Sequence, residues 1–322
     1  MQVDIDGHVS ETIDLITGCA QGSTLGPRIF SLYCRSISEK IKPNLIAYAD
    51  DSYVVVIEDN IDAAKDSVKT ASKQHIEELK RLGMVVNRDK TEVTVFSRSK
   101  IQVHHFDIDG ILIKSKPHIK VLGMIFDSRL SWREHVEAVC KKTINKITVL
   151  KHIRRLFDKK QFLRIVTSQV FGLLYYGAPV WLVPTLEQPL WKLINSVHYK
   201  ALRLVYNDHI GVTPRWKLSS ELKRATPREW SKYCTANTVI KVLRNKLPVN
   251  LYTQLNETLF FERRRPGIAK FYDSSRLRIG RQTLGCRIDF MNSLPTWYSL
   301  GLSDDQIRRL LKSAFFKYMD GQ

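Results

Sequence analysis

The sequence feature that most constrains the fold is an acidic pair, Asp50-Asp51, enclosed between two apolar runs. Residues 44–47 precede the segment Tyr48-Ala49-Asp50-Asp51, and residues 53–57 follow it. The runs predict two strands, with the acidic pair as the tight turn of a β-hairpin. Two adjacent carboxylates repel each other, so a rigid hairpin that holds them together indicates a hard divalent cation such as magnesium. A solvated turn is the alternative, because Asp is common in turns.

A glycine-bearing loop lies upstream of this hairpin. Gly18, Gly22, Gly26 and Pro27 fall within thirteen residues, which predicts a bent backbone before a helix over residues 29–41. Such a loop can lie against a phosphate or a base. It can equally be an ordinary strand-to-helix turn.

Five segments in order resemble the reverse transcriptases of non-LTR retrotransposons, in particular jockey-like and CR1-like elements. They are Gln21-Gly22-Ser23 with Leu25-Gly26-Pro27 and Phe30 (motif B), Tyr48-Ala49-Asp50-Asp51 (motif C), Leu82 to Asn87 with Lys90-Thr91-Glu92 (motif D), Val121-Leu122-Gly123-Met124 (the primer-grip strand), and Leu130-Ser131-Trp132 with His135-Val136 (the entry to the thumb). The resemblance is dense from about residue 1 to about residue 185, with a weaker echo at Phe290 to Pro295.

The resemblance implies a role for each matching residue. Asp50 is implied as the direct metal ligand and Asp51 as its neighbour beside the primer terminus, in a site for two magnesium ions that manganese could replace. Tyr48 and Ala49 would line the nucleotide and primer end, and we expect Tyr48 and Asp50 to share one face of a strand. The remaining implied contacts are Gln21 and Gly22 with template and incoming nucleotide, Lys90 with the pyrophosphate charge or as a proton donor, and Leu122 and Gly123 beneath the primer backbone.

The implied partners are an RNA template, a DNA primer and deoxynucleoside triphosphates. In this family another metal-ligating aspartate lies on a strand well upstream of motif B, yet only seventeen residues precede Gly18. Those residues predict a hairpin over 3–9 and a strand over 12–16, so we expect the fingers and the first half of the palm to be missing. We therefore expect no polymerase activity from this chain alone. The alternatives are a non-enzymatic, basic nucleic-acid-binding remnant and a decayed element copy.

Composition favours an intracellular protein with a polyanionic partner. The 322 residues carry 51 Lys and Arg against 32 Asp and Glu, a formal net charge of +19 that predicts nucleic-acid binding or, alternatively, a solvated basic surface. The most apolar run, 170–184, is too short to cross a bilayer, so no membrane is expected. Five scattered cysteines without zinc-ligand spacing favour a reducing compartment, the nucleus or the cytoplasm.

The expected fold class is α+β. We expect a partial polymerase palm at 1–125, an antiparallel sheet with covering helices, then a helical thumb at 126–210 and a basic, mostly helical region at 211–322. Within the palm, an apolar repeat from Ile61 to Leu82 predicts a helix that packs His75 against a sheet. We also expect a strand at 91–97 and a hairpin at 106–113 around Asp109-Gly110.

Basic residues follow the predicted thumb helix. Apolar residues from Val136 to Leu150 define one side, and the other predicts contact with the phosphates of a duplex, or else a solvated face. The predicted contact residues are Lys141, Lys142, Lys146, Lys151, Arg154 and Arg155. Further on, Arg263 to Arg281 is rich in arginine with Phe271 and Tyr272, which suits single-stranded nucleic acid, a nuclear import signal or an exposed loop equally.

Overall fold

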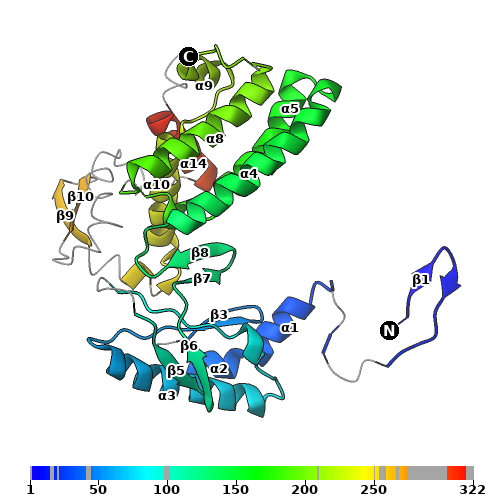
Figure 1. Ribbon diagram of the computed structural model, residues 1–322, viewed down its shortest axis with the longest axis vertical. Helices are drawn as coiled ribbons and strands as arrows, with labels where there is room; N and C mark the ends of the chain where they lie inside the picture. Colours follow the sequence, from blue (N-terminus) through cyan, green and yellow to red (C-terminus); the bar gives the residue numbers. More distant parts are fainter. Residues whose placement is uncertain are drawn as a thin grey trace. The chain divides into compact units, whose positions relative to one another are not determined.

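The computed structural model describes most of the chain and divides it into two compact units, Met1–Ile119 and Lys120–Gln322. The described residues are 2–14, 18–19, 22–40, 45–97, 102–183, 185–208, 210–249, 251–253, 259–265, 268–273 and 303–316. Helices and short antiparallel strands occur together, so the fold is α+β (Figure 1).

Unit 1 combines β-hairpins with helices. Its elements are β1 (Asp4–Ile5), β2 (His8–Val9), α1 (Gly26–Tyr33), α2 (Arg35–Lys40), β3 (Leu45–Tyr48), β4 (Asp51–Val54), α3 (Ile61–Arg81), η1 (Arg88–Lys90), β5 (His105–Ile108) and β6 (Ile111–Lys114). The pairs β1–β2, β3–β4 and β5–β6 are antiparallel, and among the described residues each remains a two-stranded sheet. The predicted hairpins at 3–9 and 106–113 are confirmed.

Two sequence predictions in this unit need correction. The helix expected over 29–41 is two shorter helices, α1 and α2, separated at Cys34. The strand expected at 91–97 is reduced to a single bridge between Thr94 and Lys116.

Helix α3 organises the core of unit 1. Its N-terminus is capped by Asn60, whose Oδ1 accepts a hydrogen bond from the Ala63 N–H at 2.9 Å. The buried face includes His75 and Ile76, and Ile76 belongs to the same core cluster as Phe106 on β5. His75 is therefore a packed histidine, as predicted, and burial lowers its pKa.

Unit 2 is mainly helical. Its elements are β7 (His118–Val121, where the division between units falls), β8 (Met124–Asp127), α4 (Arg133–Ile153), η2 (Arg154–Leu156), α5 (Lys159–Val166), the π-helical turn η3 (Thr167–Phe171), α6 (Gly172–Leu174), α7 (Ala178–Trp181), α8 (Gln188–Tyr206), α9 (Arg215–Glu221), α10 (Pro227–Asn245), β9 (Leu259–Arg265), β10 (Ile268–Asp273) and α14 (Asp304–Phe315). Strands β7 and β8 pair, and β9 pairs antiparallel with β10.

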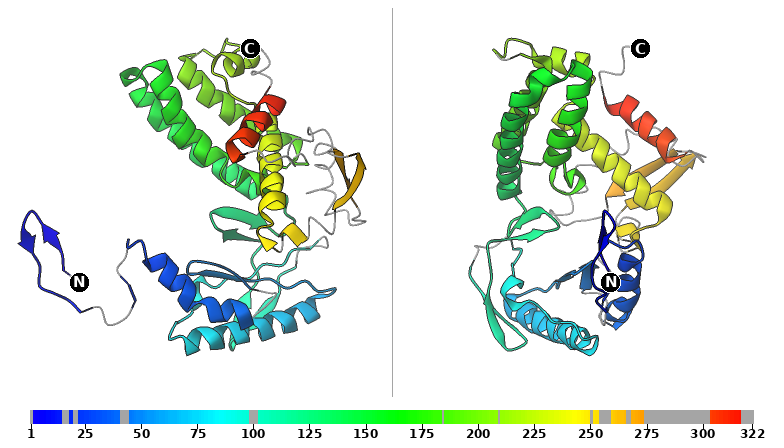
Figure 2. Two further views of the ribbon diagram at one scale, coloured as in Figure 1. Left: turned by 180° about the vertical axis from the view of Figure 1, so that it is seen from behind. Right: turned by 90° about the vertical axis from the view of Figure 1, so that its right-hand side faces the viewer.

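The main core of unit 2 lies between α4 and α8, which pack side by side (Figure 2). The apolar side of α4 predicted from the sequence is confirmed, because Val136, Val139, Cys140, Ile147 and Leu150 are buried. A second cluster joins α10 to α14. In the described part of the chain no helix has the length and apolar character needed to cross a membrane.

The C-terminal region contains a pair of strands as well as the helices α9, α10 and α14. Residues 259–265 and 268–273 form the β9–β10 hairpin, which includes Arg263, Arg264 and Arg265. The segment Phe290 to Pro295 and the arginines up to Arg281 lie outside the described residues.

Candidate functional site

The acidic segment lies at the tip of the β3–β4 hairpin. Tyr48 pairs with Asp51, so Ala49 and Asp50 form a two-residue turn. The prediction that both aspartates form the turn is thus corrected, since Asp51 begins β4. The expected common strand face of Tyr48 and Asp50 is also wrong, because Asp50 belongs to the turn.

The turn is conformationally strained. Ala49 has a φ of 51°, a left-handed conformation that costs a residue with a Cβ about 1–2 kcal/mol. Two-residue hairpin loops need positive φ to match the twist of the flanking strands, and glycine normally supplies it. Backbone strain of this kind gathers at functional sites.

Opposite faces of β4 have different neighbours. Ser52 Oγ lies 2.9 Å from His75 Nε2, a hydrogen bond that joins the hairpin to α3. Asp51 and Tyr53 lie two residues apart and therefore share the other face, where the Tyr53 hydroxyl donates to Asp51 Oδ2 at 3.2 Å. Tyr48 is 64% exposed, and Asp50 and Asp51 are also exposed. The hairpin is anchored from one side and presents its carboxylates to solvent.

The donor set at this tip suits a hard cation but is incomplete. Carboxylate oxygens are the ligands that magnesium prefers. Asp50 and Asp51 supply two carboxylates, and nowhere among the described residues do three or more His, Cys, Asp or Glu side chains converge as a metal-binding group. The residues therefore fit half of a metal site.

The other predicted residues of unit 1 lie on turns. Gly22 has a φ of 82°, and Ser23 Oγ accepts the Gly26 N–H at 3.0 Å at the start of α1. The loop therefore opens a helix, as predicted, whereas Gln21 lies outside the described residues. Lys90 is exposed at the end of η1, and its N–H donates to Asn87 Oδ1 at 3.3 Å.

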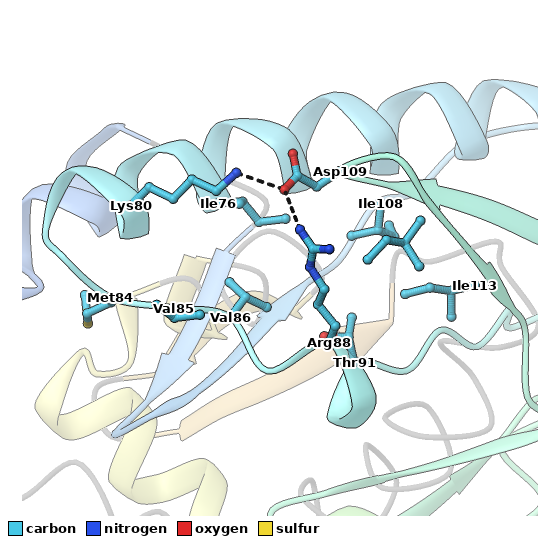
Figure 3. Close-up of a pocket in the computed structure, with 11 residues that line it drawn as sticks. Ile76, Lys80, Met84, Val85, Val86, Arg88, Thr91, Ile108, Asp109 and Ile113 are labelled. Atoms are coloured by element: carbon cyan, nitrogen blue, oxygen red, sulfur yellow. Dashed lines mark hydrogen bonds and ion pairs between the residues drawn. The ribbon is translucent and has the colours of Figure 1, made fainter.

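A cavity that sequence reasoning missed lies beside the motif D segment. It measures about 120 Å³ and is bounded by α3, the loop from Met84 to Thr91, and the β5–β6 hairpin (Figure 3). At its rim Asp109 Oδ2 lies 3.0 Å from Lys80 Nζ and 4.0 Å from Arg88 Nη2. Asp109 was predicted only as a turn residue, but it also ties the start of η1, and hence Lys90, to the hairpin.

In unit 2, Leu122 and Gly123 form the two-residue turn between β7 and β8. Their φ angles are 46° and 84°. The Tyr176 hydroxyl donates to the Leu122 carbonyl at 3.0 Å, and a Cβ at Gly123 would lie 3.3 Å from Tyr176 Cε1. The sequence predicted that Leu122 and Gly123 lie in the primer-grip strand. This prediction is corrected, because both residues have left-handed backbone and form the turn between two strands.

The basic face predicted for α4 is only partly available. Lys141, Lys142, Lys151 and Arg155 are exposed, whereas Lys146 is half-buried. Arg154 differs from them, because its guanidinium donates to the carbonyls of Phe157 at 2.9 Å, Leu204 at 3.1 Å and Val205 at 2.9 Å. Arg154 joins η2 to the end of α8 inside the fold, so its prediction as a phosphate contact is corrected.

Comparison with known proteins finds one matching family and several relatives. Residues 2–126 match the family described as reverse transcriptase (RNA-dependent DNA polymerase). Three relatives from Drosophila melanogaster are similar to the chain. They are the probable RNA-directed DNA polymerase from transposon BS (20% identical, 59% of this chain, 21% of the relative), the RNA-directed DNA polymerase from mobile element jockey (22%, 56% and 21%), and the probable RNA-directed DNA polymerase from transposon X-element (22%, 62% and 22%).

These alignments of 190–204 residues are longer than the family match, so the similarity continues into unit 2. The chain spans about a fifth of the length of these relatives. No solved structure shows significant similarity to it. Residues 2–126 therefore carry a reverse transcriptase domain, and the family match, the relatives and the ordered motifs support a fragment of a non-LTR retrotransposon reverse transcriptase.

Proposed function

We propose that this chain contributes one half of the catalytic palm, together with thumb-like helices, to an RNA-directed DNA polymerase that uses two divalent metal ions. The observation that carries the proposal is the pair of exposed carboxylates at the strained tip of the β3–β4 hairpin. The substrates proposed are an RNA template, a DNA primer and deoxynucleoside triphosphates.

In this proposal each residue of the hairpin has one task. Asp50 binds metal directly, and Asp51 is oriented by the hydroxyl of Tyr53. Tyr48 offers an exposed ring to the nucleotide or primer end. When bound there, divalent ions supply charge neutralisation and activation of the attacking hydroxyl. The link from Ser52 to His75 keeps the turn at a fixed distance from α3.

Exposed apolar side chains support an incomplete palm. Large apolar residues of α1 (Ile29 and Leu32), of β3 (Ile46) and of the segment after β4 (Ile57) all face solvent in unit 1. Within the described residues β4 is the sole strand that pairs with β3. Further polypeptide that covers these side chains and extends the sheet would complete a hydrophobic core and could contribute another carboxylate.

Without that carboxylate the chemistry should fail. Phosphoryl-type transfer depends on positioning and charge neutralisation more than on covalent steps, so the loss of one metal ligand removes the main source of rate enhancement. We therefore propose that the chain alone extends no primer.

The test is primer extension on an RNA template with magnesium. The chain alone should give no product, whereas the chain joined behind the upstream part of the jockey polymerase domain should extend the primer. Asp50→Asn in the joined protein should abolish extension, and Asp59→Asn, which alters an exposed aspartate ahead of α3, should not. Extension that survives Asp50→Asn would contradict the proposal.

A second candidate function is nucleic-acid binding without catalysis. The exposed Lys141, Lys142 and Lys151 of α4 favour it. Contacts with phosphates release counterions, so the logarithm of the binding constant should fall linearly with the logarithm of salt concentration. Salt-dependent duplex binding with no extension by the joined protein would favour this reading over the polymerase.

A further inference from the structure

Three large apolar side chains in a short segment of unit 2 are turned to solvent. Ile210 is 89% exposed, Val212 77% and Trp216 73%. We call these three residues the Trp216 patch. Trp is highly buried on average, so an indole this exposed is unusual for a side chain with only a structural role.

The loop that carries Ile210 and Val212 is held in place by Asp208. Its Oδ1 accepts the N–H groups of Gly211 at 2.8 Å and Val212 at 3.2 Å, and its Oδ2 accepts that of Thr213 at 2.9 Å. Burial alone would raise the pKa of this carboxyl, but these hydrogen bonds together hold the pKa below its ordinary value. The backbone around Ile210 and Val212 is therefore held by Asp208 through Gly211, Val212 and Thr213.

Trp216 lies on the outward face of α9, whose other face is buried. Leu218 and Leu222 of this segment belong to the main core of unit 2. The Arg215 guanidinium lies 5.2 Å from the centre of the Tyr199 ring on α8, and α8 and α9 are in contact (Figure 1). Because α9 is fixed in this way, the indole of Trp216 points away from the core on a rigid support.

The surrounding charge is strongly basic. The described residues between 199 and 224 include the cations Lys200, Arg203, Arg215, Lys217, Lys223 and Arg224 and the acids Asp208 and Glu221. Asp208 is engaged by the loop and by Arg203 at 3.7 Å, and Glu221 by Lys159 and Lys217 at 3.8 Å each. Arg224 donates to Thr167 Oγ1 inside the fold, so the exposed excess of charge comes from Lys200, Arg215 and Lys223. The excess of positive charge favours a polyanionic partner over a neutral or basic one.

We propose that the Trp216 patch binds unpaired nucleotides of single-stranded nucleic acid. A base stacks on the indole of Trp216, aliphatic contacts come from Ile210 and Val212, and the flanking cations attract the phosphates. Exposed aromatic residues set among cations bind single strands in this way without reading sequence, because every base offers a π-face. The inference does not depend on catalysis at Asp50.

The test measures the affinity of the full chain for a fluorescein-labelled twelve-nucleotide single strand by anisotropy. We expect Trp216→Ala to weaken binding roughly tenfold, Trp216→Tyr to restore most of it, and a strand of abasic residues to bind both proteins equally. Leu156→Ala is the matched control, because Leu156 in η2 is also exposed, at 74%, and should leave the affinity unchanged.

Three outcomes would overturn the proposal. One is equal affinity of Trp216→Ala and the unaltered chain for the normal strand. Another is an equal loss on the abasic strand, which would show that the substitution acts without base stacking. The third is a loss of self-association in sedimentation, with oligonucleotide affinity intact, which would assign the patch to contact between copies of the chain. Thermal unfolding of each variant, measured in parallel, checks that the fold is retained.

Discussion

We predict that two buried histidines make the stability of unit 2 sensitive to acid. His198 is 2% exposed, and its ring stacks on Phe171 at 4.9 Å with Nδ1 2.7 Å from the Tyr175 hydroxyl. Burial, aided by the charge of Arg224, lowers the pKa of His198 from 6.5 to about 3. His135 is 1% exposed, and burial together with Lys142 lowers its pKa to about 4.

The sign of the effect follows from where the proton binds. Below pH 6.5 the unfolded chain protonates both imidazoles while the folded chain keeps them neutral, so stability falls as pH falls until the folded pKa values are reached. At pH 5 each histidine should favour the unfolded state by about 2 kcal/mol relative to pH 8. The two together should cost about 4 kcal/mol, a large part of the ~5–15 kcal/mol typical of a folded protein.

Urea unfolding followed by circular dichroism at pH 8 and pH 5 measures this change. With a slope near ~2–3 kcal/mol per molar urea, the midpoint should fall by roughly 1.5 M. His198→Gln should remove about half of the pH dependence, whereas His152→Gln, at an exposed position of α4, should leave it intact. A midpoint that is the same at pH 8 and pH 5 would refute the assignment of both histidines as buried and neutral.

Three further predictions concern unit 2. Gly123→Ala should lower the free energy of unfolding by about 1–2 kcal/mol because of left-handed strain, and contact of the new Cβ with Tyr176 should add to the loss. Calorimetry should show a smaller loss for the control Gly110→Ala, where φ is 79° but no atom lies within 4 Å of the added Cβ. Asp127→Ala should cost about 2–3 kcal/mol, because three backbone N–H groups donate to this buried carboxylate; a loss below 0.5 kcal/mol in urea unfolding would be inconsistent with that network. Cys140 is 1% exposed and burial raises its thiol pKa to about 12, so at pH 8 a thiol reagent should label it only after unfolding, and rapid labelling of the native protein, located by mass spectrometry, would argue against the buried assignment.

Local sequence patterns correctly predicted the helices and hairpins that depend only on residues close together in the chain. The apolar repeat of α3, the buried side of α4 and the hairpin around Asp109-Gly110 each follow from a periodicity or a turn dipeptide. The acidic hairpin was predicted too, but the turn was placed at Asp50 and Asp51, one residue beyond the observed turn at Ala49 and Asp50. Apolar residues at 44–47 and 53–57 suggest strands on both sides, yet the pairing of Tyr48 with Asp51 is set by the turn geometry of Ala49, which no composition rule reveals.

Long-range contacts account for the other differences. Arg154 looks like any basic residue at a helix end, and only the folded chain brings the carbonyls of Leu204 and Val205 to its guanidinium. The cavity beside Met84 is likewise lined by residues far apart in the sequence, and Lys80 and Arg88 meet Asp109 at its rim. Sequence similarity pointed to a reverse transcriptase domain and to Asp50 and Asp51 as candidate metal ligands, whereas the packing that fixes their surroundings depends on residues far apart in the chain.

The most direct test of the central proposal is whether the β3–β4 turn binds a divalent metal. Paramagnetic broadening by manganese of the Ala49 amide signal, in protein labelled with ¹⁵N-alanine, measures it. We predict broadening at Ala49 that magnesium competes away and that Asp50→Asn with Asp51→Asn abolishes, while Asp4→Asn with Asp6→Asn in the β1–β2 hairpin leaves it intact. Manganese that leaves the Ala49 signal sharp, or that still broadens it after both Asp50 and Asp51 are replaced, would contradict the account.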